Sequence, residues 1–124
     1  MPTEPAQPND MKLQDSLYKI LSQDGGTFEV TMLEGHPVYE GHFPGQPITP
    51  GVLSLAMVRE CASLLCGGEL RYSAIKNCRL TAMIRPGERL IITIAIDQDH
   101  QLTATVATPD GEQKLQLDGT LLKV

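Results

Sequence analysis

The feature that most constrains this chain is a proline- and glycine-rich segment that runs directly into an apolar one, HFPGQPITPGVLSLAMVRECASLL at residues 42–65. Its three prolines lack backbone donors and fix their own φ angles, so the first half cannot be a central strand or a helix interior. Thr49 can serve as a helix N-cap, and Pro50 suits the first helical position. We therefore predict a stiff loop and then a helix that ends at Gly67 and Gly68.

The predicted helix is apolar nearly all round, which indicates burial on most of its surface. Its apolar residues are Val52, Leu53, Leu55, Ala56, Met57, Val58, Cys61, Ala62, Leu64 and Leu65. A helix of about sixteen residues is roughly 24 Å long, and this apolar run is too short to cross a bilayer. The helix is thus expected to form the centre of a folded domain.

Strand patterns occupy most of the remaining sequence. A short amphipathic stretch at residues 13–21 and a strand at 27–33 flank the turn signal Asp24-Gly25-Gly26, which predicts a hairpin. Four further strands are predicted after the helix, at residues 73–84, 89–96, 102–106 and 114–122. Because short turns join them, these four are expected to be antiparallel neighbours in sequence order.

The element pattern predicts one α+β domain at residues 11–124, preceded by a disordered tail at residues 1–10. A helix that is apolar all round needs cover on more than one side, and an antiparallel sheet curved around it would provide that cover. A flat two-layer sandwich is the alternative, and dimerisation could cover what one small sheet leaves open.

Composition narrows the function classes. The chain has 124 residues and a net charge of −5 without a basic cluster, which argues against nucleic-acid binding. Its beginning lacks the layout of a signal peptide, so we expect a cytoplasmic protein without a membrane segment. The cysteines at 61, 66 and 78 are expected to be reduced core thiols. No cofactor or metal is expected, because the acidic and histidine residues at 34, 36, 40 and 42 lack diagnostic ligand spacing.

Two motifs resemble a known family. The segment GHFPGQPITPGVL is similar to the active-site segment of the β-hydroxyacyl-acyl carrier protein dehydratases of fatty-acid synthesis. The later IKNCRLTAMIRPGERL resembles the strand and the Pro-Gly-acid turn that follow in that family. The resemblance covers roughly residues 35 to 96. It implies the hotdog fold, in which an antiparallel sheet wraps one long central helix.

The resemblance also implies roles for individual residues. His42 takes the place of the family's catalytic histidine, and Gly51 is expected to direct its N–H at the thioester carbonyl. A helix N-terminus carries unpaired N–H groups and a partial positive charge, which would stabilise the enolate-like charge that develops. Tyr39, Phe43 and Val52 are expected to line the acyl-binding site.

One position departs from the family pattern. The family carries a carboxylate fourteen residues after the histidine, and this chain has Ala56 there. Glu60 lies one turn further on, where the family has Gln, and is the candidate replacement acid. One helical turn is about 5.4 Å, so a direct replacement would be strained or need a bridging water. The structural alternative for Glu60 is an ion pair with an arginine, at 59, 79 or 85, or a place at a dimer seam.

Three functions follow from these residues. The first is elimination of water from a (3R)-hydroxyacyl thioester, on acyl carrier protein or coenzyme A, to give a trans-2-enoyl thioester. The second is a hotdog acyl thioesterase, in which a helix carboxylate directs water at the same carbonyl. The third is a non-catalytic or partner-dependent subunit that binds acyl carrier protein. A homodimer is expected, with a higher oligomer or a heterodimer with a paralogue as alternatives.

Overall fold

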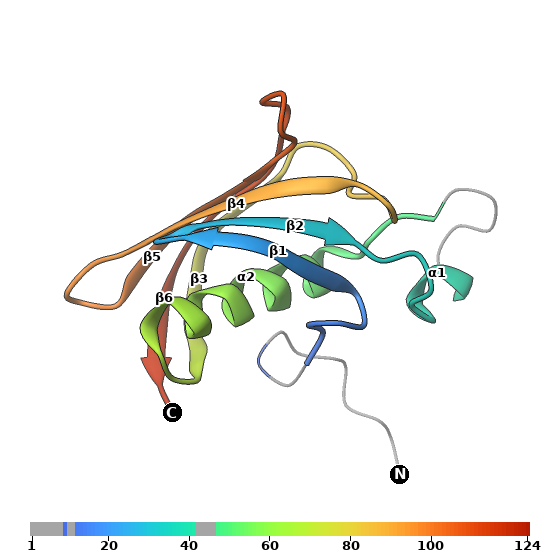
Figure 1. The fold of residues 1–124 in the computed structure, drawn as a ribbon. Coiled ribbons are helices and arrows are strands. Elements are labelled where there is room, and N and C mark those ends of the chain that lie inside the picture. Colours follow the sequence, from blue (N-terminus) through green and yellow to red (C-terminus); the bar gives the residue numbers. More distant parts are fainter. Residues whose placement is uncertain (1–8, 10–11, 42–46) are drawn as a thin grey trace, which may run out of the picture.

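The computed structural model describes residue 9, residues 12–41 and residues 47–124 (Figure 1). The predicted catalytic His42 and the predicted acyl contact Phe43 lie outside the described residues. Of the predicted tail, Asn9 alone is described, and its side-chain amide forms hydrogen bonds with the backbone N–H and carbonyl of Tyr72.

The described residues form a hairpin, two helices and four later strands. In chain order these are β1 (Tyr18–Asp24), β2 (Thr27–Met32), α1 (Val38–Gly41), α2 (Gly51–Cys66), β3 (Leu70–Leu80), β4 (Arg89–Ile96), β5 (Gln101–Ala107) and β6 (Gln113–Lys123). The predicted hairpin is confirmed, because β1 pairs with β2 and Asp24 lies opposite Thr27. Gly25 has a φ of 56°, which glycine adopts without strain at this turn.

All the strands belong to one antiparallel sheet with the order β1-β2-β4-β5-β6-β3. The prediction that the last four strands are neighbours in sequence order is therefore wrong at one place. β3 pairs with β6 at the edge of the sheet, and β4 pairs with β2 and β5. The link between β3 and β4, residues 81–88, has about eight residues and can span ~26 Å, whereas the two intervening strands require about 14 Å.

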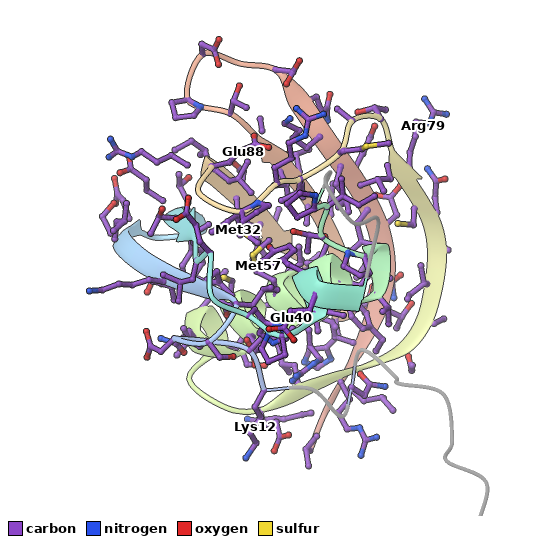
Figure 2. All side chains as sticks on the ribbon, turned by 90° about the vertical axis from the view of Figure 1, so that its right-hand side faces the viewer. Lys12, Met32, Glu40, Met57, Arg79 and Glu88 are labelled. Atoms are coloured by element: carbon purple, nitrogen blue, oxygen red, sulfur yellow. The ribbon has the colours of Figure 1, made fainter. Side chains whose placement is uncertain are left out.

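The sheet curves over α2, which lies along its concave face (Figure 1). Alternate residues of the strands point to this face, as predicted for Leu90, Ile92 and Ile94, which are all buried. Figure 2 shows the interior with Met57 of α2 and Met32 of β2 labelled, and both side chains belong to the buried core. The predicted α+β fold with an antiparallel sheet around one helix is confirmed.

The two ends of α2 differ in how well the sequence predicts them. Gly67 ends the helix in the left-handed conformation with a φ of 73°, as expected. The prediction for the start is wrong by one residue: Pro50 is the N-cap, with a ψ of 145°, and the helix begins at Gly51. Among the described residues, no side chain forms a capping hydrogen bond with it. Thr49 cannot serve as the N-cap because Pro50 is still extended and the Thr49 hydroxyl bonds with Tyr39.

Two of the three cysteines are more exposed than the sequence predicts. Cys61 is buried, whereas Cys66 and Cys78 are exposed, so the prediction of three core thiols is wrong for two of them. The reason is that Cys66 is the last residue of α2, while Cys78 lies on the edge strand β3, where Arg71 and residues 73–80 are exposed. Neither helix in the described part of the chain is long and apolar enough to cross a membrane.

Candidate functional site

The start of α2 has no side-chain cap from the part of the chain that the structure describes. Leu53 and Ser54 donate their N–H groups back to the Pro50 carbonyl over 3.1 and 3.2 Å. A Cβ added at Gly51 would meet no atom of the described residues within 4 Å. The first N–H groups of a helix carry a partial positive charge and have no partner within the helix. The helix start at Gly51 can therefore receive a carbonyl or another negatively polarised oxygen.

Two long-range contacts hold the backbone just before this helix start. The Thr49 N–H donates to the Ile84 carbonyl over 2.7 Å, and the Thr49 hydroxyl pairs with the Tyr39 hydroxyl over 2.8 Å. Thr49 is only 3% exposed. Burial raises the pKa of Tyr39; the bond to Thr49 opposes this shift, and the nearby Glu88 carboxylate adds to it. The structure thus brings α1 and the residues before α2 together.

Of the residues predicted to contact the acyl chain, Tyr39 and Val52 can be placed. Both are half-buried and pack against the core. Tyr39 directs its hydroxyl to Thr49, and Val52 lies directly after Gly51 in the first turn of α2. Both thus lie near the helix start, and whether they contact an acyl chain stays a prediction.

Ala56, where the family resemblance predicts a carboxylate, is part of the core. Ala56 is fully buried and belongs to the apolar cluster between α2 and the sheet. Its neighbours in sequence, Met57 and Val58, are fully buried as well. In this chain the face of α2 at Ala56 therefore offers packing in place of an acid.

Glu60 contacts the N-terminal segment. Its Oε2 accepts the backbone N–H of Leu13 over 2.7 Å, and its Oε1 accepts the hydroxyl of Tyr18 over 2.7 Å. Burial raises the pKa of Tyr18, and the neighbouring Cys61 and Glu60 add to this effect. Glu60 follows Gly51 by nine positions, which is about 13 Å along the helix axis. The structure thus brings Glu60 to residues 13–18 and does not bring it to the start of its own helix.

A cleft of about 940 Å³ lies beside Glu60, between the second half of α2, the N-terminal segment and the start of β3. Basic and acidic side chains both line it, among them Lys12, Arg59, Glu60 and Glu69. The buried Arg59 donates a hydrogen bond to the Leu70 carbonyl over 3.3 Å. The lining starts at Arg59 on the helix, so this cleft is separate from the open helix start at Gly51.

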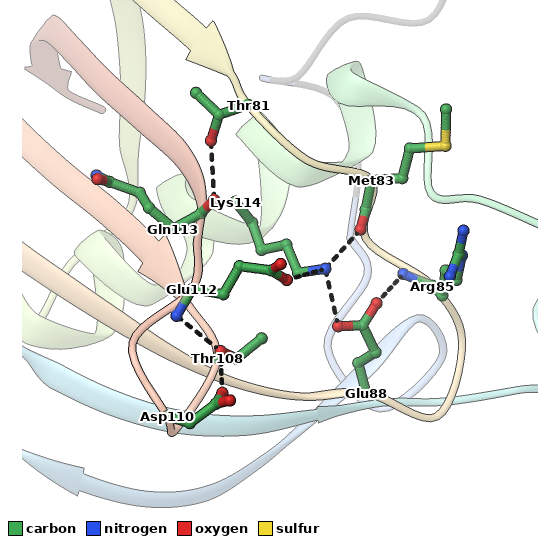
Figure 3. A network of polar contacts seen from close by, with 9 residues as sticks. All are labelled: Thr81, Met83, Arg85, Glu88, Thr108, Asp110, Glu112, Gln113 and Lys114. Atoms are coloured by element: carbon green, nitrogen blue, oxygen red, sulfur yellow. Dashed lines mark hydrogen bonds and ion pairs between the residues drawn. The ribbon is translucent and has the colours of Figure 1, made fainter.

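A buried lysine holds the link between β3 and β4 in place (Figure 3). The Lys114 ammonium donates to the Met83 carbonyl over 2.9 Å and pairs with Glu88 at 3.3 Å and Glu112 at 3.1 Å. Burial lowers the pKa of Lys114, but the two carboxylates outweigh it, so the pKa is raised. Because Ile84 belongs to the same link, this network supports the carbonyl that receives the Thr49 N–H.

Sequence reasoning missed Thr49 as a Tyr39 partner and Lys114 as a buried cation. Lys114 heads a predicted strand, and one charged residue at a strand end carries no signal of burial. Glu88 is the acid of the Pro-Gly-acid turn at residues 86–88, which is the one hint of this network in the sequence.

Comparison with known proteins identifies the family. Residues 19–118 match the family model of the ApeI-like dehydratases. The chain belongs to this family. It also matches curated proteins named 3-hydroxyacyl-[acyl-carrier-protein] dehydratase FabZ. That of Polynucleobacter necessarius is 30% identical over 110 residues, which cover 81% of this chain and 74% of the relative. That of Mannheimia succiniciproducens is 38% identical over 87 residues, which cover 61% of this chain and 58% of the relative.

Solved structures share the fold. The dehydratase heterocomplex ApeI:P from Xenorhabdus doucetiae superposes with a TM-score of 0.69 at 22% identity, over 91% of this chain and 100% of that one. A hypothetical thioesterase from Streptococcus pneumoniae gives a TM-score of 0.61 at 12% identity, over 89% of this chain and 93% of that one. At these identities the likeness shows the fold alone. The predicted hotdog fold and the dehydratase-family resemblance are both confirmed.

Proposed function

We propose that this ApeI-like chain takes part in eliminating water from a (3R)-hydroxyacyl thioester, carried by acyl carrier protein or coenzyme A, to give a trans-2-enoyl thioester. Family membership supports the reaction class. The observation that carries the assignment is the start of α2 at Gly51, which no side chain of the described residues caps and which the HFPG motif precedes in sequence.

The proposed chemistry begins at the thioester carbonyl. The Gly51 N–H donates a hydrogen bond to the carbonyl oxygen, which acidifies the adjacent C2. A neutral His42 imidazole removes one C2 proton, and the electron pair of that bond forms the C2=C3 double bond. The C3–OH bond breaks, and the hydroxyl leaves as water once it receives a proton.

That last proton must come from an acid near the C3 hydroxyl. Glu60 is the acid that the sequence predicts, yet in this structure it accepts hydrogen bonds from Leu13 and Tyr18, whereas a general acid must donate. Ala56 supplies no carboxylate. We therefore propose that Glu60 anchors the N-terminal segment and that the acid comes from outside this chain.

A second candidate function follows: a subunit that supplies His42 and Gly51 to a site completed by a carboxylate-bearing dehydratase paralogue. Two observations favour it, the alanine at position 56 and the heterocomplex among the proteins of the same fold. The exposed edge strand β3 offers a surface for such a partner, or for a second copy in a homodimer. A cytoplasmic location stays a prediction.

The test supplies the purified chain with 3-hydroxyacyl and 2-enoyl thioesters and follows the conjugated enoyl absorbance, with and without a carboxylate-bearing paralogue. Turnover that disappears in His42→Ala supports the proposal. Turnover only in the mixture selects the partner-dependent subunit. Full turnover in His42→Ala, or none under any condition, rejects both. Released thiol with a flat enoyl signal selects the thioesterase reading instead.

A further inference from the structure

The hydroxyl pair of Tyr39 and Thr49 joins two stretches of chain that flank the HFPG motif. Tyr39 belongs to α1 and precedes His42 by three positions, whereas Thr49 precedes Gly51 by two. Their oxygens are 2.8 Å apart, and Thr49 is 3% exposed. A buried hydroxyl without a partner is costly, so each of these groups holds the other in place.

The direction of the Thr49 hydroxyl matters for the helix start. A serine or threonine at the N-cap normally turns its hydroxyl onto the first N–H groups of the helix, but here Pro50 holds that position. The Thr49 hydroxyl, one residue earlier, contacts Tyr39 instead. It therefore ties the residues before α2 to α1.

The backbone of Thr49 is held independently of its side chain. Its N–H donates to the Ile84 carbonyl over 2.7 Å, and the link that contains Ile84 is braced by Lys114 through Met83. The Gly87 N–H of the same link donates to the Met32 carbonyl of β2 over 2.8 Å. Thr49 is therefore the point where α1, this braced link and the start of α2 meet.

We propose that Tyr39 and Thr49 are positioning residues for the elimination, acting as a clasp that holds α1 against the start of α2 and so fixes the position of the Gly51 N–H. This role rests on the proposed function. It gives Tyr39 a task other than the predicted acyl contact. It also assigns a role to Thr49, which the sequence predicts only as a helix cap.

The kinetic test compares three single variants. Thr49→Val removes the hydroxyl and keeps the shape and the backbone bond to Ile84, Thr49→Ser keeps the hydroxyl, and Tyr39→Phe removes the other partner. Thr49→Val and Tyr39→Phe should each lower kcat by about 10- to 100-fold, as misplacement of reacting groups by about 1 Å can do, with a much smaller change in KM. Thr49→Ser should stay close to the wild type.

The double variant tests the pairing itself. Each single change breaks the same hydrogen bond between Tyr39 and Thr49. The kcat of the double variant, Thr49→Val with Tyr39→Phe, should therefore be no lower than that of either single variant. Multiplied losses in the double variant, or a Thr49→Ser as slow as Thr49→Val, would overturn the clasp. Unchanged kcat in both single variants of an active protein would also overturn it, while leaving the dehydratase assignment intact.

Hydrogen–deuterium exchange gives a readout that does not need turnover. The amides of residues 49 and 53, which donate to the Ile84 and Pro50 carbonyls, should exchange faster in Thr49→Val than in the wild type, and Thr49→Ser should restore the slow rate. If the wild-type chain is inactive in every mixture, the proposed function fails, and this exchange pattern still decides the clasp. Equal exchange in all three proteins would reject it.

Discussion

At the scale of single residues, Glu60 shows how one side chain can serve fold or chemistry. Its two oxygens accept one bond each from Leu13 and Tyr18, which ties the segment before β1 to the middle of α2. Hydrogen bonds to a charged group contribute about 1.5–3 kcal/mol each. Two such bonds are sufficient to explain a carboxylate on an otherwise apolar helix without invoking catalysis.

Glu60→Gln should therefore destabilise the fold and leave most of the activity of folded protein in place. The amide can accept only one of the two bonds, so we expect a loss of about 1–3 kcal/mol in the free energy of unfolding, measured with urea. Glu69→Gln is the matched control, because Glu69 lines the same cleft but is exposed. A large fall in kcat at unchanged stability would instead support Glu60 as the acid.

At the scale of elements, α2 buries a thiol against the sheet. Burial raises the pKa of Cys61 from its ordinary 9.0 to about 12; a hydrogen bond with Tyr18 opposes this, and the nearby Glu60 charge adds to it. The folded state then keeps a proton that the unfolded state loses as the pH rises above about 9. This contribution to stability is complete below pH 9 and is lost as the pH rises toward 12.

We expect the free energy of unfolding to fall between pH 9 and 10, with a limiting slope of about 1.4 kcal/mol per pH unit from this one group. Cys61→Ala should be less stable at pH 7 because it leaves a cavity, and its stability should fall less steeply with pH. Urea unfolding at several pH values measures both slopes. Equal slopes for wild type and variant would contradict the assignment.

The link between β3 and β4 is a second element whose position depends on one residue. Lys114→Met keeps the aliphatic stem but removes the three contacts of the ammonium group, with Met83, Glu88 and Glu112. Of the two carboxylates, that of Glu112 is the more exposed. We expect a loss of about 1–3 kcal/mol in stability, because the Met83 carbonyl loses this hydrogen bond and Glu88 loses its ion pair while keeping the bond from the Arg85 N–H. Arg89→Met is the control, since its ion pair with Glu29 lies on the surface. Equal losses in the two variants would contradict a structural role for Lys114.

At the scale of the whole molecule, the sheet ends in a long strand that is exposed over most of its length. β3 has 11 residues, and Ile75 and Leu80 on it are 41% and 47% exposed. An exposed apolar edge strand is a template for pairing with another chain. Dimerisation through β3 would cover these side chains and bring a second subunit next to the first.

We expect Ile75→Lys with Leu80→Lys to convert a dimer into a monomer, because two charges would then face the pairing strand. Sedimentation velocity at several concentrations measures the change in mass. Leu21→Lys is the control, because Leu21 is similarly exposed, at 44%, on β1 at the opposite edge of the sheet. A monomeric wild type, or a dimer disrupted only by Leu21→Lys, would contradict this interface.

Much of the fold could be predicted because it depends on neighbours in sequence. The alternation of Leu90, Ile92 and Ile94 indicates one buried strand face, and Gly67 marks the helix end through its own backbone preference. The HFPG motif likewise predicts the family. The site was predicted less completely, because Glu60 and Leu13 are 47 positions apart and nothing local relates them.

The sequence by itself determined which segments are strands, where the central helix lies and which family the chain belongs to, since periodicity, backbone preference and motif are local properties. The tertiary structure alone decided that β3 lies at the edge beside β6, that the Thr49 hydroxyl faces Tyr39, and that Glu60 faces the N-terminal segment. These outcomes depend on which distant segments the folded chain places side by side. A buried polar group bonds with the partner that it meets there, whatever its neighbours in sequence suggest.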